Sequence, residues 1–584
     1  MEASMLGQRS PQKSLFEADT QYLDFVGRDS FYAFLAAQRG QLFRDEDFAG
    51  LYNASWGRPG VPPSLLATAL ILQTYDGVSD EEARQRACYD LRWKVALGVE
   101  MDRRPFAKST LQEFRAQLVL HEEQQALFKR SLELARQRGH FKGERKLRLA
   151  LDTTNILGQG AVKDTYNLLA DGIVLVLRAL AQRAGVRLAE YVESAGYGRY
   201  VAGPSLKGQA EIDWSDASAR RRFLAGIVAD ADRLLEEVRQ ARGGLEPASA
   251  EDRRLAAAAA SLSRVLGQDI ERREDGPDLR GGVARDRMPS VHDPEMRHGR
   301  KSKSKRFDGH KLQLAVDTES QLITDVAVLA GNAPDREQAL EVVEESEVLT
   351  GCQVAETLGD TAYGDGATRQ RFAQAGRTLI AKAPPVRNQG YFAKTAFAID
   401  LEAQTCRCPA GRVSQDLRAR ANGGGIFRFA ADVCAACPLR PQCVRGRGGR
   451  SVQVHAQEAL LQEARRFQQT PAFRLAQASR QVAEHRLARL VQLGIRQARY
   501  RGTAKTLFQA FMVATVANLT LLAAGLGADL SLSVLGAGLI ALWVAYRRLS
   551  GDPHSLQSRR LHLAPNLSSE AAKPLKLAAS RPDL

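Results

Sequence analysis

The chain has 584 residues, of which 44% are hydrophobic and 26% are charged, and this composition excludes a wholly disordered chain and a fibrous protein. Lys and Arg number 82 against 67 Asp and Glu, so the formal net charge is +15. This surplus favours a polyanionic partner, either nucleic acid or an anionic membrane surface, although a basic solvated surface is the commoner explanation of such a charge.

Seven cysteines are too few for a disulfide scaffold in a chain of this length. Five of them gather between residues 406 and 443, and this clustering indicates a metal site and a reducing compartment. Residues 1–21 contain no apolar run, so we expect no signal peptide.

The N-terminal region, 1–140, is predicted to be helical. Pro62-Pro63 opens one helix, because Pro in the first turn lacks only an N–H that would be unpaired anyway. Ser79 can cap a second helix, and a third is expected from Ser109 to about His121. The pattern is compatible with a helix-turn-helix unit and equally with a plain helical bundle.

Strand patterns alternate with helical ones further along the chain, which favours an α/β layer. Strands are expected at 146–152, 310–317, 322–331, 354–360 and 378–383. Helices are expected at 160–290, 335–349, 366–376 and 455–525, and the polar stretch 281–306 is expected to be loop.

Two uncharged stretches, 506–528 and 530–546, are long enough to cross a bilayer. Gln509 and Asn518 make the first read as a helix buried in protein. We expect no membrane segment, although the second stretch keeps that alternative open.

Two expected strands end in a carboxylate, Asp152 and Asp360. Acids that converge at one edge of a sheet repel each other, and a divalent cation such as Mg²⁺ relieves the repulsion. A third acid, Glu484, lies on the expected helix 472–493 one turn after Arg480. The alternatives are that the aspartates cap turns and that Arg480 and Glu484 form a surface pair.

Basic residues concentrate in 297–311, a run that suits contacts with DNA phosphates or is simply a solvated loop. The cations we expect to contact DNA there are Arg300, Lys301, Lys303, Lys305, Arg306 and Lys311. Recognition of the DNA sequence is expected from the helical region 60–120, through Gln112 and Arg115. The Cys434-x₂-Cys437 spacing is typical of structural Zn²⁺ sites, whereas Cys88 and Cys352 are expected to be packed thiols.

Several segments in a fixed order carry a resemblance. They are PPSLLATALILQTYDGVSDEEARQRACYDLRWKVALG, STLQEFRAQL, LDTTNI, VHDPEMRHGRKSKSKRFDGHKLQLAVD, LAGNAPD, LGDTAYGDG, CPAG with CAACPLRPQC, RQVAEHRLARL and YRGTAKTLFQAFMVATVANL. Together they resemble the bacterial insertion-sequence DDE transposases that have an InsH-like N-terminal domain and an RNase H-like α/β core. The chain is most similar to the insertion-sequence family eleven-eighty-two, over most of residues 14–525.

The resemblance implies that Asp152, Asp360 and Glu484 are the catalytic acids and hold two Mg²⁺ or Mn²⁺ ions, and that Arg480 contacts DNA. It implies that water cuts a DNA strand at an end of the element, after which the freed 3′-OH attacks target DNA. Asp365 is a spare carboxylate near Asp360 that departs from the family pattern. The structural Zn²⁺ ligands implied are Cys408, Cys434, Cys437 and Cys443, with Cys406 either extra or in place of Cys408.

The implied organisation is a helical N-terminal DNA-binding or assembly domain followed by a split core with two inserts. The parts are 1–140 for that domain, 141–160 and 297–399 for the core, 161–296 for a helical insert, 400–452 for a zinc insert, 453–528 for the C-terminal core helices and 529–584 for an apolar helix with a disordered tail. Double-stranded DNA is the expected partner, bound by a homodimer in the bacterial cytoplasm, at the nucleoid. The rival hypotheses are a DNA-binding relic without activity and a metal-dependent nuclease that does not join strands.

Overall fold

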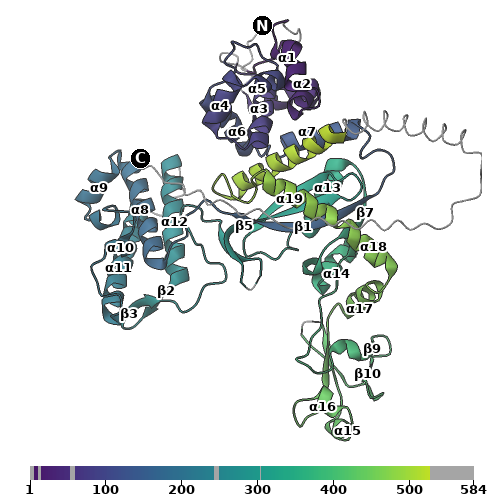
Figure 1. Cartoon of the computed structure of the whole chain (residues 1–584). Helices are drawn as coiled ribbons and strands as arrows, with labels where there is room; N and C mark the ends of the chain where they lie inside the picture. Colours follow the sequence, from purple (N-terminus) through teal and green to yellow (C-terminus); the bar gives the residue numbers. More distant parts are fainter. Residues whose placement is uncertain are drawn as a thin grey trace, which may run out of the picture. The chain divides into compact units, whose positions relative to one another are not determined.

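The computed structural model describes residues 6–10, 15–52, 60–242, 249–302, 304–421 and 423–525. Figure 1 shows their helices and strands in the order of the chain. The expected apolar helix and tail at 529–584, the stretch 530–546 within them, and Lys303 lie outside the described residues.

The N-terminal region is helical, as expected. Its elements are α1 (Ala18–Val26), α2 (Phe31–Leu42), the 3₁₀ helix η1 (Asp45–Leu51), α3 (Pro63–Asp76), α4 (Asp80–Tyr89), α5 (Leu91–Leu97), α6 (Lys108–Leu120) and α7 (Ala126–Gln137). Local signals set several of these ends. Pro63 is the first residue of α3, and the Ser79 hydroxyl accepts a hydrogen bond from the Glu82 N–H at the start of α4.

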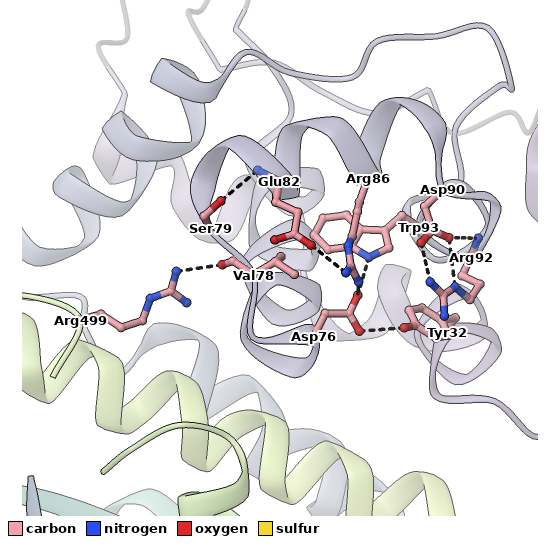
Figure 2. A network of polar contacts seen from close by, with 10 residues as sticks. All are labelled: Tyr32, Asp76, Val78, Ser79, Glu82, Arg86, Asp90, Arg92, Trp93 and Arg499. Carbon is pink, nitrogen blue, oxygen red and sulfur yellow. Dashed lines mark hydrogen bonds and ion pairs between the residues drawn. The ribbon is translucent and has the colours of Figure 1, made fainter. Parts of the chain in front are cut away.

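A polar network centred on Asp76 joins four of these helices, α2, α3, α4 and α5 (Figure 2). The carboxylate of Asp76 ends α3 and accepts hydrogen bonds from Tyr32 Oη at 2.8 Å, Trp93 Nε1 at 2.7 Å and Arg86 Nη1 at 2.9 Å. The negative charge of a carboxylate at a helix C-terminus is repelled by the negative end of the helix dipole. The three hydrogen-bond donors offset this repulsion. Arg499, from the C-terminal part of the chain, donates to the Val78 carbonyl beside this network at 2.8 Å.

The central sheet is mixed. Its strands are β1 (Leu147–Leu157), β4 (Arg297–Arg300), β5 (Arg306–Asp317), β6 (Ile323–Ala330), β7 (Val354–Leu358) and β8 (Thr378–Ile380). The order is β4-β5-β1-β7-β8, with β6 also paired to β5. β1 runs antiparallel to β5 and parallel to β7, and β7 runs parallel to β8. This mixed sheet with its helices agrees with the expected α/β core.

Helices cover this sheet. They are α13 (Ala339–Thr350), α14 (Gly366–Gln374), α17 (Glu458–Phe467), α18 (Pro471–Ser479), α19 (Gln481–Gln492) and the helix Thr503–Gly525. α19 lies against β1 and β5, whereas α13 lies against β5 and β6 (Figure 1).

The helix Thr503–Gly525 is long and apolar enough to cross a membrane, but 72% of its most apolar window is buried inside the protein. The buried Asn518 side chain fixes it to the sheet, because it accepts from the Ile323 N–H at 2.9 Å and donates to the Ile323 carbonyl at 2.8 Å. The helix is therefore part of the core, as its polar residues predict.

Two further groups of elements have apolar cores of their own. The first comprises α8 (Thr165–Ala184), α9 (Leu188–Ser194), η2 (Gly198–Tyr200), α10 (Leu206–Gln209), α11 (Ala217–Arg242), α12 (Ala250–Asp269), β2 (Ile270–Arg273) and β3 (Gly276–Leu279). The second, the Cys segment, comprises η4 (Lys394–Ala396), β9 (Ala398–Asp400), β10 (Thr405–Arg407), β11 (Val413–Ser414), β12 (Leu417–Ala419), β13 (Gly425–Arg428), α15 (Ala431–Ala435), α16 (Arg440–Cys443) and β14 (Ser451–Val454).

The structure corrects four expected boundaries. The strand expected over 146–152 continues to Leu157, because its second half pairs with β5, so Asp152 lies inside β1. The polar stretch 281–306 contains a strand, β4, because its backbone pairs with the first half of β5. The helix expected from Asp335 begins at Ala339, after the turn that Pro334 starts. The helix expected over 472–493 is two helices, α18 and α19, separated at Arg480.

Candidate active site

The parallel pairing of β1 with β7 brings Asp152 and Asp360 together, although Asp152 lies inside β1, which continues to Leu157, and not at the end of a strand as expected. Ala150 is in register with Leu358, and Asp152 and Asp360 each follow their member of this pair by two residues. On the other side of β1, Asp152 is opposite Leu314 of β5. Both carboxylates therefore lie at the same edge of the sheet, where open α/β sheets bind ligands.

Helix α19 adds the third acid to this edge. Arg480, at the junction of α18 and α19, donates from Nη1 to Asp152 Oδ2 at 3.2 Å and pairs with Glu484 through its other terminal nitrogen. One guanidinium thus links the acid of the strand to the acid of the helix. Glu484 is the more accessible of these two carboxylates, with 54% of its side chain exposed against 19% for Asp152.

Burial raises the pKa of Asp152, and the nearby negative charges of Asp360 and Glu484 act in the same direction. The Thr153 N–H, at 2.8 Å, and the Arg480 guanidinium oppose this shift. Specific partners therefore stabilise the charged form of Asp152 at a position where burial and neighbouring acids disfavour it. Perturbed groups of this kind are concentrated in functional sites.

Asp360 and Asp365 have different roles. Asp360 follows β7 and accepts a hydrogen bond from the Ala362 N–H at 2.8 Å, which starts the 3₁₀ helix η3 (Thr361–Tyr363). Asp365 caps α14 through the N–H groups of Ala367 and Thr368, and its carboxylate pairs with Arg336 at 3.0 Å. The spare carboxylate is accordingly occupied by a structural task.

Two residues that pack beside the acids, Gln477 and Tyr363, were not predicted from the sequence. Gln477 of α18 donates from Nε2 to the carbonyls of Gly359 at 3.3 Å and Ile380 at 3.4 Å, so it fixes α18 to the strand ends beside Asp360. Tyr363 is buried, and Gln313 Nε2 lies 3.3 Å from its hydroxyl. The pKa of Tyr363 is raised well above its usual value by burial and also by the charges of nearby acids, among them Asp152 and Asp360. The string TAYGD, which contains Tyr363, is the sequence feature from which this residue could have been identified.

A divalent cation fits the chemistry of these acids, because Mg²⁺ takes carboxylate oxygens and a cation relieves their mutual repulsion. Burial is the main cause of the raised pKa of Asp152, and the charges of Asp360 and Glu484 add to it. Among the residues that the structure describes, however, no three His, Cys, Asp or Glu side chains are close enough to form a metal-binding group as they stand. The positive charge that links Asp152 to Glu484 here is Arg480.

The four predicted zinc ligands, Cys408, Cys434, Cys437 and Cys443, line one small cavity of about 30 Å³ in the Cys segment. Burial raises the pKa of Cys443, and negative charge on the other three thiols acts in the same direction. Cys406 is fully buried in β10, which raises its pKa to about 11. Thiolates suit Zn²⁺, but the search for metal-binding groups in the described residues finds none here either, so a formed zinc site is not supported.

The fold separates the cations of residues 297–311 into exposed residues and one residue with internal partners. Arg300, Lys301, Lys305 and Arg306 are exposed where β4 turns into β5. Lys311, further along β5, is instead 13% exposed and pairs at 2.6 Å with both Asp335 Oδ1 and the Ala333 carbonyl. Its contacts are internal, so a phosphate contact by Lys311 is not supported.

Arg115 is buried as well. Its guanidinium donates to Asp80 Oδ1 at 2.8 Å and to Tyr500 Oη at 2.6 Å, so it joins α6 to α4 and to the C-terminal part of the chain. Gln112 is exposed and donates to Asp80 Oδ2 at 2.9 Å. Burial of Asp80 opposes its ionisation, but hydrogen bonds, including those from Gln112 and Arg115, lower its pKa to about 2. The contacts of Arg115 are those of a structural residue, and they do not support direct reading of bases.

Cys88 and Cys352 are buried, as the sequence predicts. Cys352 follows α13, where burial raises the pKa of its thiol. Neither belongs to the acidic edge or to the Cys segment.

The fold and the site together define a class: an α/β protein with an acidic site at the edge of a mixed sheet and basic residues around it. Two family models match the chain, the transposase domain DUF772 over residues 21–117 and the transposase DDE domain over residues 407–523. The first covers most of the N-terminal helices, and the second covers most of the Cys segment and the helices that carry Arg480 and Glu484. No curated protein matches the chain. The two family matches together support an insertion-sequence DDE transposase.

Proposed function

We propose that the protein cuts DNA at the ends of an insertion sequence and transfers the freed 3′-OH ends into target DNA. The observation that carries the proposal is the convergence of Asp152 and Asp360, through the β1–β7 register, with Glu484, through Arg480. The match to a DDE domain includes Glu484 but neither aspartate, so the fold contributes evidence that the match does not. The core is RNase H-like in this proposal, and the element belongs to the insertion-sequence family eleven-eighty-two.

The three acids hold the divalent cations, Mg²⁺ or Mn²⁺. When two such ions are bound, they supply Lewis-acid stabilisation to the attacking and leaving oxygens of a phosphodiester. Asp152 presents its carboxylate from within β1 and Asp360 from just after β7, whereas the exposed Glu484 completes the set from a helix. Arg480 keeps Asp152 and Glu484 near each other, and its guanidinium would suit a DNA phosphate if the acids held cations.

The DNA is held by cations outside the acidic set. Arg300, Lys301, Lys305 and Arg306 are exposed at the turn between β4 and β5, and β5 is the strand that pairs with β1 beside Asp152. Such contacts position DNA without reading its sequence. The N-terminal domain reads the ends of the element, with Gln112 as the exposed member of the predicted pair.

The remaining expectations belong to the same proposal. The protein works as a homodimer on double-stranded DNA, in the bacterial cytoplasm and at the nucleoid. The domain limits are those given from the sequence, and Cys408, Cys434, Cys437 and Cys443 bind one structural Zn²⁺ after small movements of their thiols. Their common cavity and the charge coupling among them support this, whereas the present spacing of the side chains does not.

The test is strand cleavage of DNA that carries the element's end, with Mg²⁺ present. Asp152→Asn, Asp360→Asn and Glu484→Gln should each abolish cleavage and leave DNA binding largely intact, because an amide is a poor metal ligand. Asp365→Asn is the matched control, because Asn also caps a helix and this position is outside the acidic set. Cleavage at the wild-type rate by the Glu484→Gln variant would show that the third acid is wrongly assigned.

Cleavage and joining assays together separate the rival hypotheses. A DNA-binding relic binds without cutting in its wild-type form, and a nuclease cuts without joining. Joining of a pre-cut 3′-OH end to a second DNA is therefore the measurement that distinguishes a transposase from a nuclease.

A further inference from the structure

A large groove begins where the acidic edge of the sheet ends. Its cavity volume is about 680 Å³. Its walls come from the start of α14, the segment after β8, the start of α17 and the Cys segment. The residues that line it are Asp365, Gly366, Ala367, Pro384, Pro385, Val386, Arg387, Lys394, Arg420, Gln453, Val454, His455, Ala456, Gln457, Leu461 and Arg465.

The groove is continuous with the acids along two segments of chain. Asp365 follows Asp360 through the single turn of η3, and Arg387 follows the end of β8, the strand next to β7. These segments run side by side, because a Cβ on Gly364 would lie 1.8 Å from the Lys382 carbonyl oxygen. The guanidinium of Arg369 also donates to carbonyls in both, those of Gly364 and Ala381.

The charges in the groove leave two cations uncompensated. Glu458, buried at the start of α17, pairs with both Lys394 and Arg465, the latter through Nη1 at 3.4 Å, so one carboxylate is shared by two cations. Asp365 pairs with Arg336 outside the groove. Arg387 and Arg420 are exposed, and within the described residues their side chains make neither a hydrogen bond nor an ion pair.

The lining indicates what kind of partner fits. Two free guanidinium groups suit phosphate, which they can bind with two parallel hydrogen bonds each. The described lining contains no Phe, Tyr or Trp, so it lacks the platforms on which unpaired bases stack. Pro384, Pro385 and Val386 add an apolar and rigid wall instead. The partner is accordingly a sugar–phosphate backbone that is bound without regard to sequence.

We propose that this groove, through Arg387 and Arg420, holds the phosphate backbone of the DNA that extends from the scissile phosphate at the three acids. The proposal rests on the proposed DNA-cutting function for the position of that phosphate. It assigns a function to the Cys segment, because Arg420, which follows β12, lines the same groove as Arg387. The segment then acts as a clamp on DNA that the acids have engaged.

The experiment measures binding of the full-length protein to a fluorescent random-sequence duplex at several salt concentrations. Arg387→Ala with Arg420→Ala should weaken binding and reduce the slope of log affinity against log salt by about 1–2 units, since each lost phosphate contact contributes about 0.9. Arg387→Lys with Arg420→Lys should keep most of the slope, because the charge remains. Arg253→Ala with Arg254→Ala, which removes two exposed arginines from α12, is the matched control and should leave the slope unchanged.

An unchanged salt slope in the Arg387 and Arg420 alanine variant overturns the proposal, as does an equal loss in the Arg253 and Arg254 control. The lysine variant tests whether the effect comes from lost charge or from misfolding. Binding that is retained in this variant shows that the groove tolerates substitution at both positions and that positive charge is what it requires. Cleavage of end DNA by the wild-type protein is measured in parallel. Failure of cleavage refutes the proposed function, whereas a changed salt slope still shows that the groove binds a backbone, so the two failures are distinguishable.

Discussion

Removing the Asp76 carboxylate should cost the N-terminal domain a large part of its stability. Only 8% of the Asp76 side chain is exposed, and it accepts from Tyr32, Arg86 and Trp93 at 2.7–2.9 Å. Asp76→Ala would leave the Trp93 indole N–H without its partner in a side chain that is 0% exposed, and would leave Arg86 without one of its two carboxylate partners.

The magnitude follows from these contacts. An orphaned buried donor costs about 1–3 kcal/mol, and breaking a buried ion pair by removing one partner costs about 3–5 kcal/mol. We expect a loss of about 3–5 kcal/mol, less than the sum of the two costs, because Arg86 keeps its bond to Glu82. Domains are stable by only about 5–15 kcal/mol, so the N-terminal domain of this variant should open measurably while the sheet remains folded.

Hydrogen exchange followed by mass spectrometry is the suitable measurement, because it reports each region of a multidomain chain separately. Peptides from α3, α4 and α5 should exchange much faster in Asp76→Ala than in the wild-type protein. Asp24→Ala is the matched control, since it removes an Asp–Arg pair in which both side chains are more than 70% exposed, and it should change nothing measurable. A loss of less than about 1 kcal/mol in the Asp76 variant would refute the view that this carboxylate organises the domain.

Three further predictions concern pH, DNA and metal. The pKa of Asp80 is lowered from 3.8 to about 2, so its stabilising contacts are complete above pH 3.8 and are lost as the pH falls toward 2; exchange in α6 should accelerate over this interval in the wild-type protein and depend less on pH in Asp80→Asn. Lys301→Ala with Lys305→Ala should lower the salt slope of DNA binding by about one unit per lost contact, and an unchanged slope contradicts the assignment of these residues. Cys437→Ser should lower the zinc content from about one ion per chain, measured by elemental analysis, and a wild-type protein made with zinc but free of it would remove the zinc site.

Local chemistry is readable without the fold. The start of α3 at Pro63 and the cap of α4 by Ser79 both follow from neighbouring residues, which is why the sequence predicts them. The resemblance to insertion-sequence transposases is likewise a property of the order of motifs, and two family models confirm it. The burial of the apolar helix Thr503–Gly525 was also predictable, because Gln509 and Asn518 are polar groups that require partners.

Residues that depend on distant partners are decided only by the tertiary structure. The basic pattern cannot distinguish Lys311, which is paired with Asp335, from Lys305, which is exposed, because the difference is set by which strand each residue joins and what lies opposite. Arg115 looks like a base-reading residue on a helix but is buried against Tyr500, far away in the sequence.

The acidic site shows the same division. The sequence predicts a strand at each of Asp152 and Asp360, but it misplaces the end of β1, which continues to Leu157. The proximity of the two acids comes from the parallel register of β1 with β7, which is set by hydrogen bonds between strands far apart in the chain. The joining of Asp152 to Glu484 by Arg480 and the formation of a cationic groove by Arg387 and Arg420 depend on packing in the same way. Charge and residue type are local properties of a sequence, whereas the neighbours that compensate a charge or leave it free are assembled by the fold.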